Sequence, residues 1–217
     1  MRLLFLGLAA IALSAPGRGQ QSAVFQADFS NPEVVPSHWT LTLHPDGTGH
    51  FHSERGNAPI QDPPTLEAPN VDRDIQVSES FAEGIFQRVR GHAIRDGHCE
   101  SHMKVAFQGW KTVSYSGPEG HWSCEFNFSR DKDVQTLGDS LMAVAGTILE
   151  GARLETLLQH DRLGLDKEME FVSDAAADGR LLQICAIRGI LEQLAGDSAV
   201  LDRVRKRART LLAKSTD

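Results

Sequence analysis

The spacing of the apolar residues changes once along this chain, near Arg130–Asp133, and that change limits the folds it can adopt. Before it, apolar and polar residues alternate, most regularly from His121 to Phe128, as in strands with one wet and one buried face. After it, apolar residues such as Leu137 and Leu141 recur at helical spacing. Strands followed by helices predict an α+β fold.

Residues 38–53 carry a strong hairpin pattern, because apolar residues alternate from Trp39 to Leu43 and Pro45-Asp46-Gly47 supplies turn chemistry. Residues 20–37 are expected to form a loosely ordered lead-in. The proline-rich residues 56–72 are expected to form a surface loop.

A short strand at Ile75–Val77 is expected to precede a helix that begins after Ser78, a good N-cap residue. A three-strand meander is expected to follow. Its first strand would send Met103, Val105 and Phe107 into the core, and its last strand would be the regular segment from His121.

The sequence therefore predicts a small, mainly antiparallel β-sheet with one packed helix, followed by an all-helical C-terminal segment. The expected divisions are a signal peptide (1–19), an α+β sheet region (20–130) and a helical region (131–217). We expect the helical region to pack on the sheet as one unit.

The signal peptide is predicted from Arg2, the apolar run Leu3–Leu13 and the small residues that follow it. The run is shorter than the roughly 20 residues that span a bilayer, so cleavage, for instance before Gln20, is expected rather than anchoring. The mature chain should be a soluble periplasmic or secreted protein without a transmembrane anchor.

The whole chain has a formal net charge of −7. Removal of Arg2 and Arg18 makes the mature chain more acidic still, which argues against nucleic acid as a partner. Five cations between Arg203 and Arg209 fill the helix surface that the apolar residues leave free, and we interpret them as a solvated amphipathic face rather than a polyanion site.

Three cysteines are present, and disulfides persist outside the cytoplasm. We predict a Cys99–Cys124 disulfide, because both residues have the core-facing parity of the sheet region. In a plain meander the two outer strands are too far apart for a bridge, so Cys99 must lie just before its strand. Cys185 is expected to be a small buried apolar residue rather than a nucleophile.

Nine histidines are unusual for this length. His50 and His52 share one face of a strand, and His98, Glu100 and His102 alternate in the same way. Two histidines and a carboxylate can bind a divalent metal. A solvated sheet face explains the same pattern and is the interpretation we adopt, so no metal ligand or other cofactor is assigned.

No nucleophile elbow, zinc-protease motif, phosphate loop or C-x-x-C pair occurs in the sequence. No catalytic residue is assigned for that reason. Our hypothesis is an exported, non-enzymatic interaction protein, with a protein as its possible partner. The alternative is a divalent-metal-binding protein or metal-dependent hydrolase that uses the histidine-rich strands.

Overall fold

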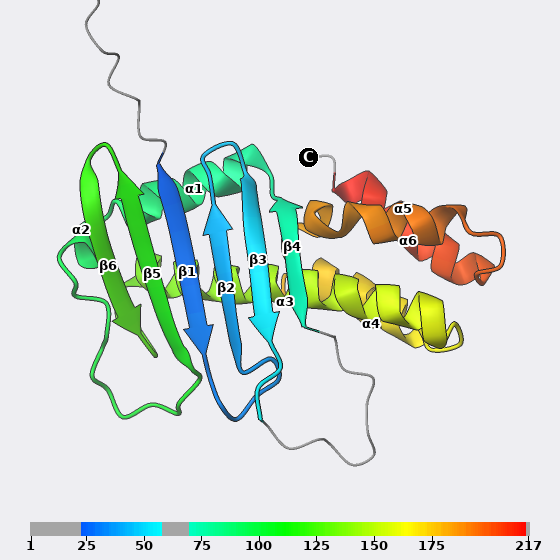
Figure 1. Cartoon of the computed structure of the whole chain (residues 1–217), viewed down its shortest axis with the longest axis horizontal. Helices are drawn as coiled ribbons and strands as arrows, with labels where there is room; N and C mark the ends of the chain where they lie inside the picture. The colour runs from blue at the N-terminus through cyan, green and yellow to red at the C-terminus, as the bar shows by residue number, and fades with distance from the viewer. Residues whose placement is uncertain (1–22, 58–69, 216–217) are drawn as a thin grey trace, which may run out of the picture.

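The computed structural model describes residues 23–57 and 70–215, and Figure 1 shows their arrangement. The predicted signal peptide and most of the proline-rich loop lie outside these residues. A six-stranded antiparallel sheet forms one layer, and helices form the second. The α+β class predicted from the sequence is confirmed.

The sheet has the strand order β4-β3-β2-β1-β5-β6, so β4 and β6 are its two edges. Its strands are β1 (Val24–Ser30), β2 (His38–Leu43), β3 (Thr48–Glu54), β4 (Val71–Gln76), β5 (Trp110–Gly117) and β6 (Gly120–Phe126). Every neighbouring pair runs antiparallel.

Two helices, α1 (Glu79–Val89) and α3 (Lys132–His160), pass behind the sheet in Figure 1 and cover one of its faces. The short α2 (His92–Arg95) contacts β6. Beyond β4 lie α4 (Leu165–Ala177), the 3₁₀ helix η1 (Ile184–Ile187), α5 (Arg188–Gly196) and α6 (Asp202–Lys214).

Buried and exposed side chains alternate along each strand, and the buried ones point toward the helices, where the core lies. In the centre of the sheet Phe25, Leu41 and Val113 are fully buried, while their neighbours Gln26 and Thr42 face away from the helices. The side of the sheet that α1 and α3 do not cover carries mainly serine, threonine, histidine and acidic side chains. We call this side the open face.

α3 is continuous over 29 residues and serves two hydrophobic clusters. Residues up to Ala152 belong to the cluster beneath the sheet, and residues from Leu154 onward belong to the cluster formed by the C-terminal helices. The change of partner falls at Gly151, where an added Cβ would lie 2.3 Å from a methyl carbon of Ile187. This glycine therefore lets η1 pack directly on the α3 backbone.

Local sequence signals explain where the two covering helices begin. Ser78 accepts a hydrogen bond from the backbone N–H of Phe81 at the start of α1. Asp131 accepts from the N–H groups of Asp133 and Val134 at the start of α3. These side chains satisfy N–H groups that the first turn of a helix leaves without partners.

The structure differs from the sequence analysis at residues 24–30 and 98–109. Residues 24–30, expected to belong to a loose lead-in, form β1, a central strand of the sheet. Residues 98–109, expected to include a strand, have no regular secondary structure, so β5 and β6 form a hairpin instead of a three-strand meander. No helix in the described residues is long and apolar enough to cross a bilayer.

Candidate interaction surface

Several large apolar side chains are exposed at one end of the sheet. Met103, Val105 and Phe107, which the sequence analysis assigned to the core, are 46%, 39% and 45% exposed. Trp110 at the start of β5 is 43% exposed and contacts Phe107 edge to face, with ring centroids 6.0 Å apart. The assignment to the core was wrong because these residues lie in a loop and not in a strand.

Val34, in the loop between β1 and β2, is 40% exposed at the same end of the sheet. The two loops are neighbours, because Trp110 pairs with Ser30 and the Cβ position of Gly109 lies 3.1 Å from Asn31. We define the apolar end patch as Val34, Met103, Val105, Phe107 and Trp110.

Hydrogen bonds to the segment after β6 hold the loop of residues 98–109. The side chain of Asn127 accepts from the backbone N–H of Gln108 and donates to the carbonyl of Ala106. The carboxylate of Glu100 accepts from the backbone N–H of Asn127 at 2.7 Å. The N–H of Ser101 donates to the carbonyl of Phe128. Fixed polar contacts therefore set the position of the exposed apolar side chains.

Glu100 is itself one of these anchors. Its partial burial disfavours ionisation, but hydrogen bonds from the backbone N–H groups of Asn127 and His102 outweigh that effect and lower its pKa. The carboxylate is consequently charged in the folded protein at neutral pH. The side chain that the sequence analysis considered as a metal ligand instead holds the loop in place.

Lys111 fixes the other end of the loop. Its buried ammonium group donates to the carbonyls of Gly109 and Asn127, at 3.2 and 2.9 Å, and lies over the ring of Phe126. Burial lowers the pKa of this amine. Gly109 has a φ of +107°, and its Cβ position lies 2.3 Å from the Phe29 ring, so a larger residue would displace the loop.

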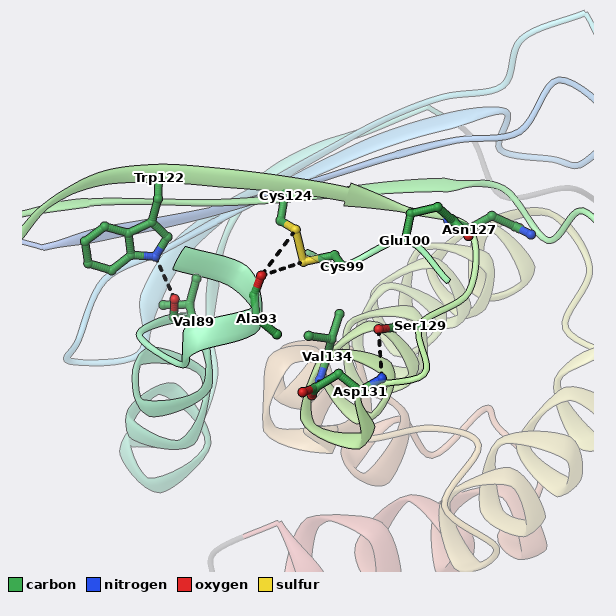
Figure 2. Close-up of a disulfide and its surroundings, with 10 residues drawn as sticks. All are labelled: Val89, Ala93, Cys99, Glu100, Trp122, Cys124, Asn127, Ser129, Asp131 and Val134. Carbon is green, nitrogen blue, oxygen red and sulfur yellow. Dashed lines mark hydrogen bonds between the residues drawn. A yellow bond between two sulfur atoms is a disulfide. The ribbon is translucent and has the colours of Figure 1, made fainter. Parts of the chain in front are cut away.

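The structure contains the predicted disulfide between Cys99 and Cys124, with the two Cα atoms 5.9 Å apart. Figure 2 shows Cys99 beneath Cys124, on the helix-covered side of β6. The bridge forms for a different reason from the one expected, because the predicted first strand of the meander is absent. Cys99 lies in the loop after α2, and no strand separates it from β6. The bridge thus ties the start of the loop to the edge of the sheet.

Cys185 is a half-buried free thiol rather than the fully buried side chain expected. It lines a cavity of about 320 Å³ between α1, α4, η1 and α6, together with Ser78, Gln183 and Lys214. Desolvation raises the pKa of the thiol, which disfavours the reactive thiolate form.

The histidine-rich strands form a row of histidine–carboxylate contacts on the open face. His50 and His52 of β3 lie beside Asp72 and Asp74 of β4, with nitrogen–oxygen distances of 2.9 to 3.3 Å. His52 also contacts Glu54 at 3.3 Å. These imidazoles are positioned by carboxylates on the neighbouring strand, which fits the solvated face proposed from the sequence.

The other histidines considered from the sequence lie elsewhere. His98 and His102 are in the loop beside β6, and three strands separate β6 from β3. The two histidine pairs therefore do not converge. Among the described residues, no group of three or more His, Cys, Asp or Glu side chains is arranged to hold a metal ion.

His52 should titrate above the ordinary histidine pKa of 6.5, because Asp72 and then Glu54 favour its charged form. The stabilisation from this contact is present below the unfolded pKa and is lost as the pH rises through the raised folded pKa. NMR titration of the imidazole signals measures the effect. Asp72→Asn should lower the pKa of His52, whereas Asp28→Asn, next to His38, should leave it unchanged. An unchanged value in Asp72→Asn would contradict this assignment.

Two aromatic side chains of the sheet and two of the α6 cations have structural partners. Tyr115 and Trp122 stack at 4.5 Å on the covered side, and the indole N–H of Trp122 donates to the carbonyl of Val89 (Figure 2). In α6, Arg203 and Arg207 both bind Asp166 of α4.

The comparisons with known proteins add no further assignment. No protein-family model matches this chain, and no curated protein sequence is significantly similar to it.

Proposed function

We propose that this chain is an exported, non-enzymatic interaction protein that binds another protein through the apolar end patch. The observation that supports the proposal is the exposure of four apolar side chains between Met103 and Trp110 on a loop anchored at both ends. Contiguous exposed apolar side chains are typical of protein–protein contacts, and anchoring lowers the entropy cost of binding.

The chemistry of the patch favours a protein partner with a small apolar pocket. Aromatic and methionine side chains are enriched at the centres of protein interfaces. Glu33 beside Val34 and Lys104 within the loop give the patch neighbours of both charge signs, which does not favour a highly charged polymer as the partner. We place Phe107 and Trp110, which contact each other, at the centre of the interface.

The test is a comparison of Phe107→Asp with the wild type. Crosslinking in the exporting cell, followed by mass spectrometry, should identify a partner of the wild type that Phe107→Asp no longer captures. Binding of that partner, once purified, should be weakened about tenfold or more, as for a central interface residue. Leu163→Ser is the matched control, since Leu163 is 85% exposed in the distant α3–α4 loop.

A partner that binds Phe107→Asp and wild type equally well would contradict the use of this surface. Elemental analysis of protein purified without an affinity tag tests the metal-dependent alternative. Stoichiometric zinc, copper or iron would favour that alternative over the proposed function.

A further inference from the structure

The edge strand β6 exposes backbone groups on its outer side. Gly117 and Gly120 pair across the two-residue turn of the β5–β6 hairpin, as a hydrogen-bonded pair does in such turns. Hydrogen-bonded and non-hydrogen-bonded pairs alternate along antiparallel strands. The backbone N–H and C=O groups of His121, Ser123 and Glu125 must therefore point away from β5, toward the free edge.

Asn127 provides an independent check on this pattern. It is the next residue in the same outward-facing series, and its N–H donates to the Glu100 carboxylate rather than to β5. No hydrogen bond within the described residues engages the N–H groups of His121, Ser123 or Glu125 in this direction. Glu100 thus binds the edge just beyond the end of β6. The outward N–H groups of His121, Ser123 and Glu125 can therefore pair with another strand.

The other edge of the sheet is protected. The 3₁₀ helix η1 contacts β4, and the sulfur of Cys185 lies 3.7 Å from the carbonyl oxygen of Gln76. Charged residues at 72–74 also occupy β4, whereas residues 120–126 contain no proline and no lysine. Lysines, prolines and covering segments are usual protections of an edge strand, and β6 contains no lysine and no proline.

We propose that β6 pairs with β6 of a second copy of this chain, antiparallel and centred on Ser123. This register places His121 of each copy opposite Glu125 of the other, and it brings the two Ser123 residues face to face. All three side chains are exposed on the open face, so the pairs form where no helix intervenes.

Side-chain complementarity and the backbone hydrogen-bond pattern agree only in this register. The sequence His-x-Ser-x-Glu is complementary to itself when reversed, because an imidazole N–H can donate to a carboxylate directly across a strand pair. The outward N–H and C=O groups of each of these residues also lie opposite those of the facing residue in the second copy. Two six-stranded sheets then form one continuous sheet across a two-fold axis.

The first experiment is sedimentation equilibrium of the chain as recovered after expression, with Ser123→Lys as the disrupting variant. The wild type should be dimeric. Ser123→Lys places two like charges together at the axis and should weaken self-association about tenfold or more. Gln26→Lys adds the same charge to the open face two strands away, on β1, and should leave the dimer intact.

A charge exchange tests the register. His121→Glu creates two carboxylate–carboxylate contacts and should dissociate the dimer. Combining His121→Glu with Glu125→His restores both imidazole–carboxylate pairs between the two copies and should restore the dimer. Equal unfolding temperatures for all variants confirm that they fold.

Hydrogen exchange locates the contact. The amides of His121, Ser123 and Glu125 should exchange slowly in the wild type and fast in Ser123→Lys. A monomer throughout the micromolar to millimolar range would overturn the proposal. A dimer in which these three amides exchange fast, or a monomer that pairs this edge with a strand from a different protein, would overturn it as well.

Discussion

A chain that carries Cys99→Ala together with Cys124→Ala is expected to lose about 3 kcal/mol of its free energy of unfolding. The bridge closes a segment with a sequence separation of 25 and so restricts the unfolded chain. Both sulfur atoms are also packed near the carbonyl oxygen of Ala93, at 3.8 and 3.9 Å, and alanine fills this space incompletely. Urea unfolding under non-reducing conditions measures the loss.

Cys185→Ala is the control for this measurement. The half-buried thiol closes no loop, so the change should cost less than about 1 kcal/mol. Non-reducing peptide mapping of protein recovered from an oxidising compartment should show the Cys99–Cys124 pair and a free Cys185. A peptide linked through Cys185, or equal stability of the double variant and the wild type, would contradict the assignment.

Glu150→Gln is expected to stabilise the protein at neutral and alkaline pH. Burial of Glu150 on α3 and its hydrogen bond with Glu168 of α4 raise its pKa from 4.5 to about 8. One carboxyl oxygen of Glu150 is buried without a hydrogen-bond partner, and Arg153 already pairs with Glu168 at 3.0 Å. Glutamine keeps the shape of the side chain and removes the cost of an ionisable group in this place.

The sign of the change in stability with pH follows from proton binding. Between pH 4.5 and about 8 the folded state holds a proton that the unfolded state has released, so stability falls as the pH rises through this range. Glu150→Gln should lose this dependence and gain about 4 kcal/mol at pH 8, with no gain near pH 4.

Urea unfolding at several pH values tests this expectation. Glu83→Gln, at an exposed position of α1, should follow the wild-type curve throughout. A parallel pH dependence in wild type and Glu150→Gln would show that Glu150 ionises normally.

The hairpin of β2 and β3, the start of α1 at Ser78 and the helical C-terminal region were predictable, because local patterns determine them. β1 was missed although Phe25, Ala27 and Phe29 alternate correctly. Its position between the predicted signal peptide and the two prolines Pro32 and Pro36 obscured it. Its central place depends on pairing with β5, more than 80 residues later.

The candidate interaction surface was not predictable from local patterns. Met103, Val105 and Phe107 alternate as a strand would. However, the side chain of Asn127 accepts from the backbone of their segment, the Glu100 carboxylate accepts from the backbone of Asn127, and both contacts hold the segment as a loop. These contacts bring together residues that are far apart in the sequence. The environment of His50 and His52 likewise depends on the register of β3 with β4, which the sequence analysis did not place.

The continuity of α3 matters for anyone who wishes to produce part of this protein. A truncation at residue 130 appears reasonable from the sequence, but it would remove the helix whose first half seals the underside of the sheet. A cut near Gly151 would separate η1 from the backbone on which it rests. Expression trials should therefore keep residues 23–215 together and vary only the ends.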